Sequence, residues 1–198
     1  MKAYLVPGAF EDLKARDYQA VLDAYKTAGY RPEFVSIDWK YETIDDWVGQ
    51  AEAKISKKDL EGSLLSGFSW GAMIALVLAG RYQTPGRLFL FSLSPYFAED
   101  FIDEQKGWFQ SAGKSRIAAF RRISMNELAA KIDCPAAVFI GSEEIRKYKE
   151  MGRRSSGAHK RIKNSRLVVI DGAKHDVAEP NYVRAIEKEL QWNPGRKK

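Results

Sequence analysis

Short apolar runs alternate with longer stretches of helical periodicity along almost the whole chain. Each run is nearly continuous, with few polar residues inside it. Such a run is typical of a strand that is buried on both faces, as in a parallel sheet covered by helices. The six runs are Ala3–Val6, Phe34–Ile37, Ser63–Ser66, Leu88–Phe91, Ala137–Ile140 and Leu167–Ile170.

Helical patterns lie between these runs. Thr43, followed three residues later by Asp46, is typical of a capped helix start. Repeated strand–helix units with right-handed crossovers predict an α/β fold of three layers, with a doubly wound, mostly parallel sheet of about six strands. A chain of 198 residues suits a single domain spanning residues 1–198. The predicted helices run over Glu11–Ala28, from Thr43 through Trp47 to Ile55, over Ala72–Ala79 and over Tyr182–Leu190.

One connection is longer than a crossover requires. About 40 residues separate Ser94 from Pro135, whereas a crossover needs only about a dozen. The surplus begins with a group of aromatic residues and continues as a basic amphipathic stretch. It predicts either a short lid over the strand ends, within residues 95–133, or one additional surface helix. The aromatic residues are Tyr96, Phe97, Phe101, Trp108 and Phe109.

The remaining composition narrows the class of protein. No apolar run approaches the roughly 18 residues of a membrane helix, and Met1–Pro7 is too short for a signal-peptide core. A single cysteine, Cys134, excludes an internal disulfide, so we expect a cytoplasmic protein. Two separated histidines and one cysteine do not make a zinc cluster. Four of the five tryptophans, Trp39, Trp47, Trp108 and Trp192, indicate packing rather than a cofactor cage. We expect no metal and no cofactor.

The net charge of +6 arises from 32 basic and 26 acidic residues. Between Arg146 and Arg166, nine Lys and Arg residues stand against one acid, Glu150. One interpretation is a solvated helix and loop; the other is an electropositive rim that attracts an anionic substrate or partner. No nucleic-acid-binding motif accompanies the charge, so we expect no DNA or RNA partner.

Gly67–Gly71 fits the pattern Gly-x-Ser-x-Gly where a predicted strand meets a predicted helix. The chain must turn sharply there, which strains the serine backbone and lifts the hydroxyl of Ser69 above the sheet. Side chains two positions to either side would collide, so glycine is needed at both. The N-terminus of the following helix favours negative charge at the same place. This context predicts Ser69 as a nucleophile.

A serine hydroxyl needs a base, and the chain offers His159 and His175. His159 is expected on an exposed helix end or loop, whereas His175 follows the last strand, at the same edge of the sheet as Ser69. The base in turn needs a carboxylate. Glu144, at the end of the fifth strand, is the first choice and Glu143 the second. Asp171 and Asp176 are nearer in sequence but face His175 poorly from the same loop, and Asp176 could cap the last helix.

The oxyanion of an acyl-transfer reaction needs backbone donors. The N–H of Trp70, directly after the nucleophile, is one candidate. The second donor is expected from the turn after the first strand, Pro7–Phe10, where either Ala9 or Phe10 could supply it.

With these segments in place, the chain resembles the α/β-hydrolase family, in its compact members with little or no lid. The N-terminal antiparallel strands of larger members are missing. The resemblance implies an ester, thioester or amide hydrolase that works through an acyl-enzyme without a cofactor. Members usually have Asp where Glu144 stands, and many have a histidine before the glycine of the first turn. The matching segments are Pro7-Gly8, Gly67–Gly71, Gly141–Glu144 and Gly172–His175.

The leading hypothesis is therefore hydrolysis of a small acyl substrate, an ester or thioester, with Ser69, His175 and Glu144 in order along the chain. A second hypothesis is a catalytically silent binding protein that keeps the fold. A third is that the basic segment recruits an acidic acyl carrier or a coenzyme A ester, with activity that falls as salt is added.

Overall fold

The computed structural model describes residues 1–13, 18–40, 42–101 and 113–192. Within these residues, six strands form one sheet in the order β2-β1-β3-β4-β5-β6, and every neighbouring pair is parallel. The predicted α/β architecture is confirmed. The strands are β1 (Lys2–Val6), β2 (Arg31–Phe34), β3 (Leu64–Phe68), β4 (Arg87–Phe91), β5 (Ala136–Gly141) and β6 (Ser165–Ile170).

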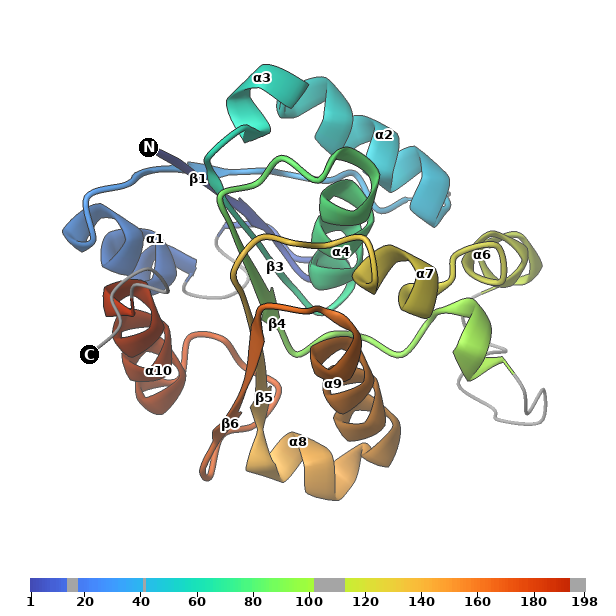
Figure 1. Ribbon diagram of the computed structural model, residues 1–198. Coiled ribbons are helices and arrows are strands. Elements are labelled where there is room, and N and C mark those ends of the chain that lie inside the picture. The colour runs from blue at the N-terminus through green and yellow to red at the C-terminus, as the bar shows by residue number, and fades with distance from the viewer. Residues whose placement is uncertain (14–17, 41, 102–112, 193–198) are drawn as a thin grey trace.

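Helices cover both faces of the sheet (Figure 1). On one face, α1 (Tyr18–Thr27) and α10 (Pro180–Gln191) pack against each other. On the other face, α4 (Trp70–Tyr82) contacts β3 and β4, with α2 and α7 against it. Short helices α3 and α6 and the 3-10 helix η1 lie in connections. The remaining bounds are α2 (Ile44–Lys54), α3 (Lys57–Leu60), η1 (Ala98–Asp100), α6 (Lys114–Phe120), α7 (Met125–Ala129), α8 (Ser142–Lys147) and α9 (Lys149–Arg161).

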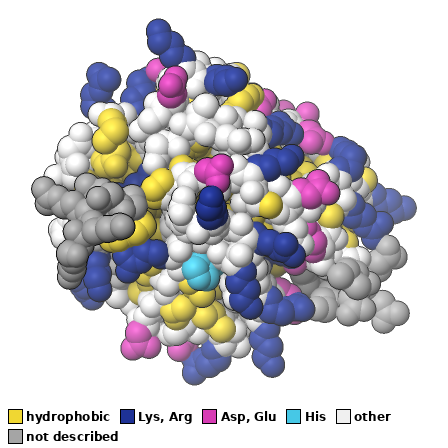
Figure 2. Space-filling view, in the orientation of Figure 1, with side chains coloured by type: hydrophobic (Ala, Val, Ile, Leu, Met, Phe, Trp, Pro, Cys, Tyr) yellow, Lys and Arg dark blue, Asp and Glu magenta, His cyan; other side chains and the backbone are white. Residues whose placement is uncertain are grey.

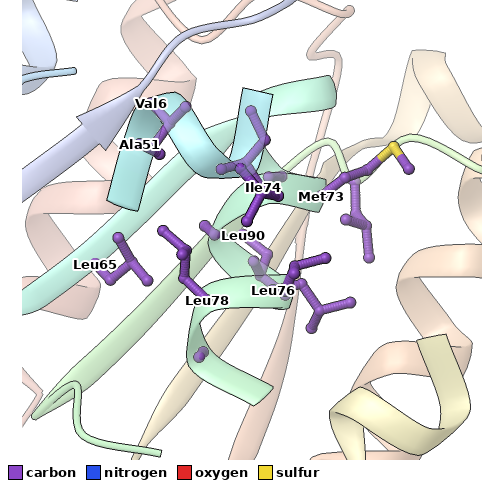
Figure 3. Packing of buried hydrophobic residues seen from close by; sticks show 14 of the residues in the cluster. Val6, Ala51, Leu65, Met73, Ile74, Leu76, Leu78 and Leu90 are labelled. Atoms are coloured by element: carbon purple, nitrogen blue, oxygen red, sulfur yellow. The ribbon is translucent and has the colours of Figure 1, made fainter. Parts of the chain in front are cut away.

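The larger core lies between the sheet and α4. This helix is apolar all round, because it packs on the strands and is itself covered by α2 and α7. Figure 3 shows Ile74 and Leu78 of the helix beside Leu65 of β3 and Leu90 of β4. The core holds α4 on the sheet and therefore fixes the position of its first turn.

The capped start of α2 is confirmed, since the carboxylate of Asp46 accepts from the backbone N–H of Thr43 at 2.8 Å. Two other predicted segments, the first helix and the second strand, differ most in their bounds. Residues 11–13 lie outside α1, which begins at Tyr18; the backbone of Glu11 turns back toward Gly8 instead, and residues 14–17 lie outside the described part of the chain.

The second strand also differs from the predicted Phe34–Ile37. It ends at Phe34 and includes Pro32, which an edge strand tolerates. The apolar residues Val35 and Ile37 leave the sheet and are buried in the core that contains α2. The strand itself is half exposed, so the apolar run marks the chain after the strand rather than the strand.

The order of the strands reverses direction at β1, which has β2 on one side and β3 on the other. The turns after β1 and β3 consequently lead to helices on opposite faces. A crevice forms at such a reversal, outside the carboxyl ends of the strands. None of the helices in the described ranges is long and apolar enough to cross a membrane.

Candidate active site

Ser69 occupies the sharp turn between β3 and α4. Its backbone has φ 56° and ψ −116°, a strained conformation for a residue with a side chain. A Cβ on Gly67 would lie 2.1 Å from the carbonyl oxygen of Gly71, and a Cβ on Gly71 would lie 2.2 Å from that of Pro7. Both glycines are thus required by close backbone approach, as the motif predicts.

His175 lies on the loop after β6 and faces Ser69. Its Nε2 is 3.2 Å from the Ser69 hydroxyl oxygen, and its Nδ1 is 2.6 Å from Oε1 of Glu144. The ring also packs on Phe68, with centroids 4.6 Å apart. Because Glu144 accepts at Nδ1, the neutral imidazole carries its proton there, and Nε2 accepts from the Ser69 hydroxyl.

Glu144 is buried, with 1% of its surface exposed. Its second oxygen, Oε2, accepts from the backbone N–H of Gly141 at 2.7 Å and from the hydroxyl of Ser92 at 2.8 Å. Both oxygens of this buried carboxylate are therefore satisfied, as burial of a charge requires. The sequence left Glu143 as an alternative; it forms an ion pair with Arg146 at the surface instead.

Ser92 and Tyr182 extend this network, and sequence reasoning assigned neither a role. The Ser92 hydroxyl donates its hydrogen bond to Glu144. The Tyr182 hydroxyl, 2.9 Å away, therefore donates to the oxygen of Ser92. Burial, together with the nearby carboxylate of Glu144, raises the pKa of Tyr182 well above its usual value, so it remains a donor. A signal existed for Ser92, because it is a polar residue directly after a buried strand.

Ser94 is a third residue to which the sequence analysis assigned no role. Its hydroxyl oxygen lies 3.1 Å from that of Ser69, and its surface is 4% exposed. It follows β4 at the same edge of the sheet as Ser69. Its position just after a buried strand was the signal in the sequence that could have identified it.

The other candidate groups lie elsewhere. His159 is in the last turn of α9 and bonds to Ser165 at the start of β6, at the opposite edge from Ser69. The carboxylate of Asp176 accepts from the backbone of Ala178, whereas Glu179 precedes the first turn of α10, so the expected helix cap at Asp176 was wrong. Asp171 is exposed and its carbonyl accepts from Asn181.

The three expected oxyanion donors lie in the turn after β1 and at the start of α4. In the described part of the chain, the N–H groups of Ala9, Phe10 and Trp70 donate to no acceptor. The Tyr18 hydroxyl accepts from Gly8 at 2.9 Å and fixes the turn. Phe10 has φ 60° and packs its ring 6.1 Å from that of Trp70. The turn after β1 thus lies next to the turn that carries Ser69. Both Ala9 and Phe10 stay candidates for the second oxyanion donor.

A cavity of about 380 Å³ opens at Ser69. Its walls are mostly aromatic and apolar. Trp70 lines the cavity and stacks on Trp47, with ring centroids 4.9 Å apart. Such a wall suits an apolar acyl group. The lining residues are Ser69, Trp70, Ser94, Pro95, Tyr96, Tyr148, Glu150, Met151 and His175.

The long connection contributes Pro95 and Tyr96 to this cavity. It continues through η1 and, beyond the gap, through α6 and α7. Trp108 and Phe109 lie outside the described residues. A lid within residues 95–133 stays a prediction.

The basic segment of residues 146–166 is not a uniformly solvated face. Arg154 is buried and paired with Asp100, which ties α9 to η1. Arg166 pairs with Glu189 at 3.4 Å. On the face shown in Figure 2, Lys and Arg side chains are spread over the middle and the outline alike, with acidic side chains among them.

Neither a metal cluster nor a competing nucleophile is found in the described ranges. No group of three His, Cys, Asp or Glu side chains there could hold a metal ion. Burial raises the pKa of Cys134 to about 11, so its thiol is largely protonated at neutral pH. Trp39 and Trp47 are buried in the core, and Trp108 lies outside the described residues.

Comparison with known proteins places this geometry on a known fold. No family profile and no curated protein matches the sequence. Among solved structures, the chain is similar to Est1E from Butyrivibrio proteoclasticus, with 16% identity, a TM-score of 0.73 and coverage of 96% of this chain and 86% of that one.

Two further structures agree. Alpha/beta hydrolase domain-containing protein 10 from mouse has 12% identity and a TM-score of 0.75, with 96% and 87% of the two chains covered. MenH from S. aureus has 15% identity and a TM-score of 0.65, with 96% and 94% covered. The chain therefore has the α/β-hydrolase fold over nearly its whole length.

Proposed function

We propose that the protein is a serine hydrolase that cleaves a small carboxylic ester or thioester through an acyl-enzyme. One observation carries the proposal: a row of hydrogen bonds joins Ser69, His175 and buried Glu144 at the mouth of a cavity. A strained serine, a histidine whose Nε2 faces the serine hydroxyl and a shielded carboxylate are the parts that nucleophilic acyl transfer requires. The similarity to Est1E and other hydrolases supports the same reaction class.

In this mechanism the Ser69 oxygen attacks the carbonyl carbon while its proton passes to Nε2 of His175. The carbonyl oxygen becomes an oxyanion, which the N–H of Trp70 and that of Ala9 or Phe10 stabilise. His175 then gives the proton to the leaving oxygen or sulfur, the bond to it breaks, and an acyl-Ser69 ester remains. Water attacks this ester with His175 as base, which releases the acid. Glu144 stabilises the imidazolium in both halves.

A fluorophosphonate probe tests the proposal, because it reacts only with an activated serine. We expect labelling at Ser69, located by peptide mapping, and its loss in Ser69→Ala and His175→Ala. Hydrolysis of nitrophenyl butyrate is expected to fall at least about 10³-fold in both variants. The matched controls are Ser156→Ala and His159→Ala, which lie away from the cavity and should label like wild type.

Absence of labelling in the folded wild-type protein would contradict the proposal and favour a catalytically silent binding protein. The alignment of Ser69 with His175 argues against that alternative, because a silent site has no need to keep a serine hydroxyl within hydrogen-bond distance of a histidine that is oriented by Glu144. We also propose that the protein acts in the cytoplasm, since its one cysteine is free.

A further inference from the structure

A second hollow, of about 580 Å³, lies beside His175 and separate from Ser69. Charged residues of α8 form one wall, and Lys174, next to His175 in the chain, forms another. Tyr148 and His175 line both this hollow and the cavity at Ser69, so the two spaces adjoin at these residues. We call this second space the histidine-side hollow.

The histidine-side hollow carries an excess of positive charge. Arg146 is paired with Glu143, and Glu144 is engaged beneath His175. Lys147 places its ammonium 5.0 Å above the ring of Tyr148. Across the described residues, neither Lys147 nor Lys174 pairs with a carboxylate, so two ammonium groups remain for a ligand.

The cavity at Ser69 has the opposite character. Among the described residues, its one charged lining residue is Glu150, which is 3.7 Å from Arg153. Its other walls are aromatic, apolar or hydroxyl-bearing. The carboxylate of Glu150 would repel an anionic acyl group, whereas it would not repel an apolar one.

The reaction decides which part of a substrate reaches which space. The acyl carbon bonds to Ser69, and its oxygen must face Trp70, so the acyl group occupies the cavity that those residues line. The leaving atom must lie within hydrogen-bond reach of His175 Nε2, which protonates it. A group that extends from that atom past the histidine enters the histidine-side hollow, which touches neither Ser69 nor Trp70.

We propose that the leaving group is an anionic alcohol or thiol, whose carboxylate or phosphate is bound by Lys147 and Lys174. This proposal rests on the proposed function and names its substrate class: an apolar acyl group esterified to a negatively charged carrier molecule. Lysine suits the task, because its ammonium is a compact charge on a flexible stem that can reach an anion in either position.

The test compares nitrophenyl butyrate with the same ester bearing a carboxylate on the nitrophenyl ring, each corrected for its spontaneous hydrolysis. We expect wild-type kcat/KM to favour the anionic ester roughly three- to tenfold at low salt, with the preference fading as salt screens the charges. In Lys147→Gln/Lys174→Gln the ratio of the two kcat/KM values should fall to about one. Using the ratio cancels any displacement of His175.

The matched control is Lys160→Gln on α9, outside both spaces, which should keep the wild-type ratio. Competition by glycerol phosphate and by glycerate distinguishes a phosphate from a carboxylate as the preferred anion. Hydrolysis through Ser69 with equal rates for both esters, or a preference that survives in the double variant, would overturn this inference alone. A folded wild-type protein that hydrolyses neither ester would overturn it together with the proposed function.

Discussion

At the scale of single residues, the hydroxyl of Ser92 links the catalytic candidates to the interior. It donates to the carboxylate of Glu144 and accepts from Tyr182, and its own backbone has φ 50°. The positive φ turns the side chain back toward β5 at the point where β4 ends. Ser92 therefore fixes the direction of Glu144 while Gly141 holds the same oxygen from the backbone.

We predict that Ser92→Ala lowers kcat about tenfold with little change in KM, because Glu144 would lose one of its two donors at Oε2 and orient His175 less well. The free energy of unfolding should fall by about 1–2 kcal/mol. Steady-state kinetics and urea unfolding measure the two effects. Tyr182→Phe serves as the graded comparison: acting through Ser92, its hydroxyl should matter less for kcat. A fall in stability with kcat unchanged would show that the network is only structural.

The residue scale also shows where sequence reasoning stops. Ser69, His175 and Glu144 could be predicted, because a strand–turn–helix motif and the shared carboxyl edge of a parallel sheet bring them together. Glu144 was the first choice, but the sequence could not exclude Glu143, since neighbouring residues differ only in which one points inward. Tyr182 was out of reach for another reason: it enters the site from inside a helix on the far face, and no local motif marks it.

At the scale of elements, the contact between α9 and η1 depends on one buried ion pair. Arg154 and Asp100 are 8% and 14% exposed, and the guanidinium also lies 5.5 Å from the centre of the Phe97 ring. Its neighbour Arg153 is 73% exposed and pairs only within α9, with Glu150. Two adjacent arginines thus have different surroundings on the same helix.

We predict that Arg154→Ala lowers the free energy of unfolding by about 3 kcal/mol, since it leaves Asp100 without its partner in a half-buried position. Arg153→Ala should change it by less than about 0.5 kcal/mol. Urea unfolding followed by circular dichroism makes the comparison. Equal effects of the two substitutions would contradict the structural role assigned to Arg154.

The predicted strand bounds agree well at β4 and β5 and poorly at β2. The apolar runs of β4 and β5 match the observed strands to within one residue at each end, because both strands lie in the middle of the sheet. At β2, on the edge, exposure permits polar residues in the strand, and the apolar residues that follow pack under α2. The apolar pattern indicates which residues are buried. At an edge strand, the buried residues and the residues of the strand are not the same ones.

At the scale of the whole molecule, the site is spread over one sheet. The turn after β1 carries Ala9 and Phe10, two of the candidate oxyanion donors; Ser69 and Trp70 follow β3, Ser92 and Ser94 follow β4, Glu144 follows β5 and His175 follows β6. Hydrogen bonds join these positions across the ladder; the N–H of Ser69 donates to Phe91, and that of Ser92 to Phe139. The site geometry therefore exists only while the sheet is intact.

We predict that activity and structure are lost together in urea. Trp70 is next to Ser69 in the chain and stacks on Trp47 in the core, so tryptophan fluorescence reports on both the site and the core. The midpoint of the fluorescence transition should coincide with that of fluorophosphonate labelling of Ser69 and with that of far-ultraviolet circular dichroism. Labelling that disappears at a clearly lower urea concentration would indicate that the loops open before the sheet does.

The two bonds of Glu144 have a consequence for how chains of this kind can diverge. One oxygen serves His175, and the other accepts the N–H of Gly141 at the entrance to α8. A lineage that abandoned hydrolysis would be free to replace Ser69 and His175, yet selection for folding would still retain the glutamate. In a set of related genes, the glutamate would thus persist in active and inactive descendants alike. The presence or absence of the serine and the histidine would show which descendants still hydrolyse a substrate.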